Sequence, residues 1–239
     1  MGKICNKCGK ENPANLIFCE DCGAVLVNIQ DSSKRSDILK EDFEKILNQY
    51  LIQREKFVTV TAPIAHFIQD ELGADLINVV NGEFPCYEVY PTAGVGNLAH
   101  CPQLSFKTDL GCDLRLHFVF IFKADMSGVY FSMRYLDRLD PDEKLKTMRD
   151  VYQYCIKKHY PDFEFLESID LKSDTAFSIS YEKATIISRF YDKDNIPSDD
   201  ELIEVMKEFI KCGKLLCELK PLKDEKLVEK VRKEYNKTH

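Results

Sequence analysis

The run of residues 114–122 constrains the fold of this chain more than any other stretch. Large apolar side chains occupy both faces of a strand drawn through it, Leu116, Phe118, Phe120 and Phe122 on one and Val119 and Ile121 on the other. Such a strand is typical of the centre of a sheet that is covered on each side. Residues 124–128 then have the composition of a turn, and residues 129–135 predict an antiparallel partner strand.

A glycine loop precedes this central strand. A strand begins at Tyr87 and breaks at Pro91, and the sequence continues as Gly94-Val95-Gly96-Asn97 before alternation resumes at residues 104–106. Two glycines around one residue let the backbone adopt positive φ and approach a ligand or another segment closely. A loop of this kind at the edge of a stiff sheet serves recognition sites, and it also serves as a simple turn.

Helical periodicity flanks the predicted sheet. Apolar stripes predict helices after residue 38, over 63–73, over 141–159 and from 198 onward, while residues 163–170, 177–181 and 186–190 read as further strands. The fold class expected is therefore α+β, with a central, mostly antiparallel sheet flanked by helices. The charged tail, 221–239, carries a narrow stripe of Leu227, Val231 and Tyr235, which predicts a helix either docked on the main domain or offered to a partner.

Four cysteines near the N-terminus have metal-ligand spacing. Cys5, Cys8, Cys19 and Cys22 form two CxxC pairs, each followed by a glycine. Four thiolates complete a tetrahedral shell, so the pattern predicts a structural Zn²⁺ site in a small zinc ribbon, residues 1–27, rather than a redox dithiol. A polar, aperiodic linker, residues 28–37, separates this ribbon from the domain expected over 38–220.

Composition sets the expected compartment. The 239-residue chain has a formal net charge of -7, which argues against non-specific coating of nucleic acid but leaves room for a local basic face. No apolar signal region and no long uncharged apolar run occur, so we expect no membrane partner and a cytoplasmic location. The scattered cysteines read as small buried hydrophobes in a reducing compartment: Cys86, Cys112, Cys155, Cys212 and Cys217.

The sequence lacks the motifs of several enzyme classes. It has no phosphate-binding GxxxxGK[ST] loop, no GxSxG nucleophile elbow, no HExxH and no zinc-deaminase pair of motifs. The adjacent His100 and Cys101 raise a thiol-enzyme alternative, which requires His100, His117 or His66 to approach the Cys101 sulfur. We expect no enzymatic activity, and we expect His66 to be a partly buried packing residue.

The order of these features resembles one known family. Residues 94–99 and 101–106 are similar to the Gly-x-Gly-Asn-(aromatic)…Pro-Trp-(apolar)-x-Phe signature of the MrcB-like N-terminal domain. Residues 128–132 resemble its Gly-Val-Tyr-Leu-Ser strand, and residues 169–171, 181–182 and 196–197 follow its later landmarks in order. The resemblance covers roughly residues 38–219.

The resemblance implies a function. This domain is the DNA-recognition part of McrBC-type restriction systems, which act on DNA with modified cytosine, and it flips the modified base into a pocket. A DNA-binding recognition protein of a defence system is therefore implied, with any motor or nuclease on a separate subunit. The positions implied to contact DNA are Gly94, Val95, Gly96, Asn97, Leu98, Gln103 and Phe120, with Phe118 and Tyr130 as further possible walls.

Three departures from the family pattern support an alternative function. Val95, Leu98 and Gln103 stand where the family has aromatic residues, and the chain has no Trp. Stacking on a base contributes about 1–3 kcal/mol, so a zinc-ribbon protein-interaction module that has lost base recognition is the alternative. Basic residues near the loop are interspersed with aspartates, which fits either a phosphate-binding face or a mixed solvated one: Lys107, Arg115, Lys123, Arg134 and Arg138.

Overall fold

The structure is a computed structural model that describes residues 3–4, 10–13, 21, 37–112, 114–135 and 142–235. The chain divides into two compact units, Met1–Ser36 and Asp37–His239. In the first, strands β1 (Lys3–Ile4) and β2 (Glu11–Asn12) pair antiparallel. The Lys10 ammonium lies 2.6 Å from the Asp21 carboxylate.

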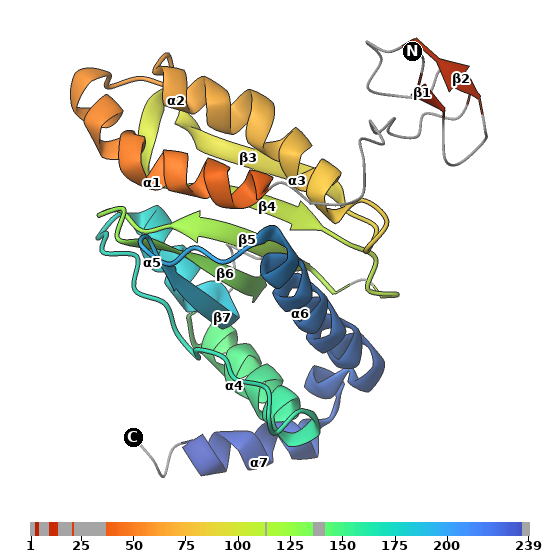
Figure 1. Ribbon diagram of the computed structural model, residues 1–239. Coiled ribbons are helices and arrows are strands. Elements are labelled where there is room, and N and C mark those ends of the chain that lie inside the picture. Colours follow the sequence, from red (N-terminus) through yellow and green to blue (C-terminus); the bar gives the residue numbers. More distant parts are fainter. Residues whose placement is uncertain are drawn as a thin grey trace. The chain divides into compact units, whose positions relative to one another are not determined.

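The second unit is built on a five-stranded antiparallel sheet, in the part of the chain that the structure describes (Figure 1). Its strands follow one another in sequence order: β3 (Tyr87–Val95), β4 (Asn97–Lys107), β5 (Leu116–Phe122), β6 (Gly128–Tyr135) and β7 (Thr185–Asp192). Every residue of β5 is buried. The prediction of a central strand covered on both sides is therefore confirmed, as is the α+β class.

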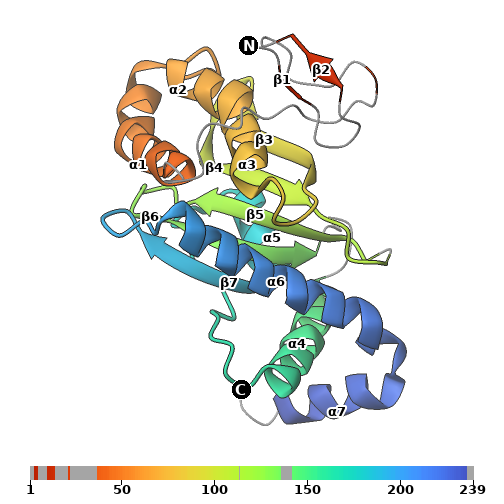
Figure 2. The ribbon, with the colours of Figure 1, turned by 45° about the vertical axis from the view of Figure 1, so that its right-hand side comes forward.

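Helices α1 (Ile38–Lys56) and α6 (Asp199–Leu219) cover one face of the sheet (Figure 2). This face is aromatic: the Phe120 ring lies 4.9 Å from Phe43 of α1 and 4.6 Å from Phe131, and the Phe131 ring lies 4.8 Å from Phe209 of α6. The predicted inner stripe of α1 is buried throughout: Leu39, Phe43, Ile46, Leu47 and Tyr50. Helix α6 begins at the predicted place, where Ser198 and Glu201 form a capping box.

Helix α5 (Ala176–Ala184) contacts the opposite face of the sheet. The prediction of a strand over 177–181 is wrong there. Residues Phe177 and Tyr181 alternate as in a strand, but they are also four apart, and their rings meet at 4.4 Å on one face of the helix. The Thr175 hydroxyl accepts a bond from Ser178 N at 3.2 Å and caps the helix. The expected strand over 163–170 is reduced to one bridge, Leu166 with Ser188.

The helix expected over 63–73 is longer than predicted. It runs as α2 (Pro63–His66), a π-helical turn (Phe67–Glu71) and α3 (Leu72–Val80). Gly73 lies inside it rather than beyond its end. A Cβ on Gly73 would lie 3.2 Å from Pro91 and 3.3 Å from Val89, so the glycine allows the helix to approach β3 closely.

The charged tail is docked. Helix α4 (Asp142–His159) packs against α7 (Glu225–Tyr235), which follows the short 3₁₀ turn Pro221–Lys223. Val231 is buried, and the Lys230 ammonium donates to the Tyr154 hydroxyl at 2.9 Å. Of the two predicted states of the tail, docking on the main domain is the one observed.

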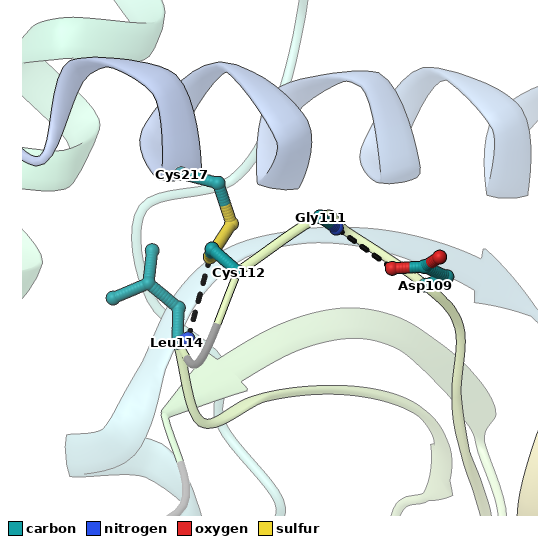
Figure 3. Close-up of a disulfide and its surroundings, with 5 residues drawn as sticks. All are labelled: Asp109, Gly111, Cys112, Leu114 and Cys217. Atoms are coloured by element: carbon teal, nitrogen blue, oxygen red, sulfur yellow. Dashed lines mark hydrogen bonds between the residues drawn. A yellow bond between two sulfur atoms is a disulfide. The ribbon is translucent and has the colours of Figure 1, made fainter.

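A disulfide joins Cys112, in the β4–β5 connection, to Cys217 near the end of α6 (Figure 3). The interpretation of these two cysteines as free buried thiols is wrong. The pairing was hidden from the sequence because 105 positions separate the two residues. Cys155 and Cys212 are buried free thiols as expected, and Cys86 is partly buried.

Two observations bear on the compartment. Among the described residues, no helix has the length and apolar character needed to cross a bilayer. Disulfides persist mainly in oxidising compartments, so the Cys112–Cys217 bond removes part of the argument for a reducing one. The cytoplasmic location stays a prediction.

Candidate nucleic-acid interface

The glycine loop is a tight hairpin between β3 and β4. Val95 pairs with Asn97, so Gly96 alone connects the two strands. Gly94 has φ +128° and Gly96 has φ +75°, values that L side chains rarely adopt. A Cβ on Gly94 would lie 2.1 Å from the carbonyl oxygen of Asn97. Gly94 is therefore required by the close return of the chain.

A neighbouring segment extends the hairpin like a short third strand. Leu98 N donates to the Val58 carbonyl at 3.1 Å, and Val60 N donates to the Gly96 carbonyl at 3.0 Å. Thr59 forms an isolated antiparallel bridge with Asn97. The loop between α1 and α2 thus holds the hairpin tip from one side.

Two further side chains anchor the base of the hairpin. The Tyr50 hydroxyl of α1 lies 2.9 Å from the carbonyl oxygen of Ala99 and 3.2 Å from that of Ala93, one on each strand. Gln69 Nε2 donates to the Gly94 carbonyl at 3.4 Å. Burial raises the pKa of Tyr50 well above its usual value, so the hydroxyl keeps its proton and stays a donor. The hairpin is held rigidly.

The structure separates the predicted DNA-contacting residues into two groups. Val95 is 97% exposed at the hairpin tip, and Gly96 and Asn97 are exposed beside it. Leu98 and Gln103 are buried, and Phe120 has no exposed surface. The hairpin is thus a projection rather than the wall of a slot. Phe120 and Phe118 belong to the aromatic core, where a base reaches neither ring unless the core rearranges.

Gln103 lies on the sheet face opposite the aromatic core, where a few polar side chains are interspersed with the apolar residues that α5 contacts. Cross-strand pairing places Gln103 opposite Ile121. In the next row of the sheet, Val119 lies between Ser105 and Ser132. Although Gln103 is only 7% exposed, its Oε1 has no hydrogen-bond partner, and the buried Oγ of Ser132 has none either. Buried polar atoms are normally paired, and these two are among several buried side-chain atoms without a partner in the described part of the chain, with Tyr152 and Tyr191 as others.

His117 and Lys107 extend this polar face. His117 is buried, and burial, together with the charges of Lys107 and Arg134, lowers its pKa to about 4. The imidazole is therefore neutral at pH 7 and offers one donor and one acceptor. Lys107 forms an ion pair with Glu88, whose carboxylate also accepts from the Tyr90 hydroxyl at 3.2 Å. His117 and Ser132 were missed from the sequence because each lies within a mostly apolar strand, and Gln103 was named only through the family resemblance.

The predicted phosphate-binding cations are mostly engaged within the protein. Lys107 pairs with Glu88, and Lys123 lies 3.7 Å from Asp125. Arg134 is buried with its guanidinium 3.5 Å above the Tyr181 ring. Arg115 also has a partner, and Arg138 lies outside the described residues. The alternative of a mixed, internally paired face fits these contacts best.

Cys101 is placed as a structural residue. Its sulfur is buried, 3.5 Å from the Ser178 hydroxyl and 3.9 Å from the Leu171 carbonyl oxygen, and burial raises the pKa of the thiol. His100, its neighbour in sequence, is exposed on the strand. His66 is also exposed, 3.5 Å from Asp70, so the expectation of partial burial is wrong for it.

The structure contains a cavity beside β7, at the other edge of the sheet from the hairpin strand β3. Its volume is about 490 Å³, and it is lined by residues around the end of α4, Arg189 of β7 and Lys211 of α6. Strand β7 is the sheet edge opposite β3. This cavity therefore does not provide the slot expected beside Asn97.

The four cysteines of the predicted zinc site, Cys5, Cys8, Cys19 and Cys22, all lie outside the described residues. Within the described part of the chain, no cluster of three or more metal-ligating side chains occurs. Zinc binding stays a prediction from the cysteine spacing.

Comparison with known proteins gives one match. The model of the family described as MrcB-like, N-terminal domain, matches residues 45–217, which include all five strands of the sheet, most of α1 and nearly all of α6. No curated protein and no solved structure matches the chain. The family model covers more than half of the sequence and includes the hairpin and the polar face described above. The chain therefore belongs to the MrcB-like N-terminal domain family, whose role is McrB-type DNA binding in restriction systems.

Proposed function

We propose that this protein recognises modified-base DNA as the reading component of a McrBC-type restriction system, with the motor or nuclease on another subunit. The observation that carries the proposal is the family match over residues 45–217, which spans the exposed glycine hairpin and the polar sheet face. The projecting hairpin at one end of β4 would contact the duplex, and the buried Gln103 further along the same strand would provide an acceptor for one base.

Gln103 supports base recognition by hydrogen bonding instead of stacking. Its buried Oε1 lacks a partner in the protein, and leaving such an acceptor unpaired costs about 1–3 kcal/mol. An amide oxygen accepts a bond from the exocyclic amino group of cytosine or adenine. Because Gln103 is only 7% exposed, a base would reach this acceptor only after the side chains above it move; the bond would then offset part of the energy needed to unstack the base.

Fluorescence anisotropy with short labelled duplexes tests this proposal. The duplexes differ only in one cytosine, which is unmodified, 5-methylated, 5-hydroxymethylated or N4-methylated. We expect one modified duplex to bind most tightly. Gln103→Leu, which keeps the approximate size but removes the acceptor, should weaken binding to that duplex by about tenfold or more. Gln49→Leu, on an exposed surface of α1, is the matched control.

Equal affinity for all four duplexes would refute base recognition while leaving DNA binding intact. An affinity of Gln103→Leu for the preferred duplex equal to that of wild type would refute the role of that side chain. Thermal unfolding of both variants separates a loss of affinity from a loss of fold.

A protein-interaction module is the second candidate. The net charge of -7 favours it, and so do the ion pairs of Lys107 and Lys123, because they engage two of the cations predicted to contact phosphate. The docking of α7 removes the tail as its binding surface, so the zinc ribbon would carry the interaction. Absence of salt-dependent DNA binding together with capture of a partner by residues 1–36 would favour this candidate.

We also propose a structural Zn²⁺ held by Cys5, Cys8, Cys19 and Cys22. The support is the doubled CxxC spacing, which four-cysteine zinc ribbons share. The metal would supply most of the folding free energy of so short a segment.

A further inference from the structure

Two tyrosines of the edge strand β3 share one face of the sheet because of a β-bulge. Tyr87 pairs with Lys107 and Tyr90 pairs with Ser105, so three steps along β3 match two along β4. Without the bulge, residues three apart in a strand would point to opposite faces. The bulge places Glu88 at φ +50°, a conformation that is uncommon for residues other than glycine. The strained backbone therefore brings both tyrosines to the face that carries Lys107.

Both tyrosines stay exposed, and hydrogen bonds hold one of them in place. Tyr87 is 45% exposed and Tyr90 is 51% exposed. The Tyr90 hydroxyl donates to the Glu88 carboxylate at 3.2 Å, and the Tyr90 carbonyl oxygen accepts from the Ser105 hydroxyl at 3.3 Å. Glu88 in turn forms the ion pair with Lys107. An aromatic side chain fixed in this way loses little conformational entropy when a flat ligand stacks on it.

The charges beside the two rings favour a phosphate backbone. Burial, followed by the charges of Lys107 and Arg134, lowers the pKa of His117, and Glu88 is the one carboxylate whose charge is resolved there among the described residues. Asp109, the next carboxylate along the chain, accepts a backbone hydrogen bond in the turn beyond β4. An exposed ion pair contributes little to stability, so a phosphate can replace Glu88 as the partner of Lys107.

We propose that Tyr87 and Tyr90 form a platform on which unpaired bases of single-stranded DNA stack, with Lys107 binding an adjacent phosphate. Every base has a flat aromatic face, so such a platform accepts any sequence, whereas the bases of an intact duplex are stacked on one another. The platform lies at the start of β3, and the hairpin tip lies at its end. It draws on DNA binding by the family but needs no modified base, and it therefore goes beyond the proposed function.

Fluorescence anisotropy with labelled single strands tests the platform. A strand of about ten thymidines is compared with an abasic strand of the same length, which keeps the phosphates and lacks the bases. Wild type should bind the abasic strand at least about tenfold less tightly. Tyr87→Ala and Tyr90→Ala should each weaken binding to the thymidine strand by about tenfold, while Tyr90→Phe, which keeps the ring, should stay within about threefold of wild type.

Two further variants separate stacking from other effects. Lys107→Gln should reduce the slope of log affinity against log salt by about 0.7, as expected for one phosphate contact on a single strand. Leu166→Ala is the matched control, because Leu166 is also 45% exposed but lies beside β7, at the opposite edge of the sheet. Its affinity should stay within about twofold of wild type. The abasic comparison needs no variant, so it decides even where an alanine substitution unfolds the protein.

The outcomes distinguish the platform from the proposed function. Equal affinity of wild type for the thymidine and abasic strands would overturn the platform, as would an equal loss in Leu166→Ala. Binding to a modified duplex without binding to the single strand would overturn the platform and leave the proposed function standing. Stacking-dependent binding to the single strand, with equal affinity for modified and unmodified duplexes, would support the platform and refute base recognition.

Discussion

Asp42 of α1 and Asp75 of α3 form a carboxyl pair that makes stability depend on pH. Burial, followed by the charge of Asp75 and a hydrogen bond to it, raises the pKa of Asp42 from 3.8 to about 7, although Lys45 opposes the shift. Asp199 raises it further, and burial also raises the pKa of Asp75. The folded protein therefore keeps a proton between about pH 4 and 7 that the unfolded chain releases.

The sign of the effect follows from this difference in bound protons. Where the folded state binds more protons than the unfolded state, stability falls as pH rises. The loss should therefore develop between pH 4 and 7 and be complete above pH 7. A pKa raised from 3.8 to about 7 sets a ceiling of about 4 kcal/mol. Because the pair keeps contact with water, we expect about 1–2 kcal/mol.

Urea unfolding of wild type and Asp42→Asn at several pH values between 5 and 8 measures the effect. The asparagine variant should be more stable than wild type by about 1–2 kcal/mol at pH 8, with the difference shrinking toward pH 5. His117, with a pKa lowered to about 4, contributes a slope of opposite sign in both proteins, and it cancels in the difference. Glu55→Gln, an exposed change on the same helix, is the control.

A constant difference between the two proteins across this range would refute the reasoning. So would an asparagine variant less stable than wild type at pH 8, because the carboxyl would then be stabilised in its charged form. A pH-dependent difference of the same size in Glu55→Gln would assign the effect to general charge.

Three further predictions concern the backbone, the disulfide and the metal. Gly94→Ala should lower the free energy of unfolding by about 3 kcal/mol or more in thermal denaturation, because its Cβ would meet the Asn97 carbonyl. The control, Gly82→Ala, should cost much less, because Gly82 has φ +83° but open space around it. Reduction of the Cys112–Cys217 bond should lower stability by about 2–4 kcal/mol, and Cys217→Ser should be insensitive to reductant; equal sensitivity of both proteins would contradict this. The purified protein should contain one zinc per chain by elemental analysis, and Cys8→Ser should lose most of it, while zinc retained in that variant would exclude the four-cysteine site.

The sequence predicted the helices and strands in which apolar residues recur at one regular spacing. Residues 116–122 form the central strand that was predicted, and the stripes of α1, α4 and α6 are buried as expected. The prediction of a strand at helix α5 was wrong because Phe177, Ile179 and Tyr181 alternate as in a strand. Three residues are too few to distinguish this alternation from the spacing of four that places two side chains on one face of a helix. The capping hydroxyl of Thr175 was the signal that could have decided for a helix.

The candidate site was predicted in part. Two glycines around one residue identified the hairpin, and its projecting tip at Val95 and Asn97 is where that pattern placed a loop. Two features of the site were not predicted: the burial of Phe120 and the missing hydrogen-bond partner of Gln103 Oε1. Both depend on which side chains of each strand point to which face of the sheet. Strand register fixes this, and a local pattern does not contain it. The Cys112–Cys217 bond has the same long-range origin.

The salt dependence of DNA affinity tests the central claim most directly, because phosphate contacts release counterions. We predict that the affinity of the wild-type protein for its preferred duplex falls at least about tenfold between 50 and 200 mM salt. Asn97→Ala should bind less tightly at every salt concentration with nearly the same slope, as expected for a contact that involves no charge. Weak binding that does not change with salt, and that is equal in wild type and Asn97→Ala, would contradict DNA recognition by this hairpin.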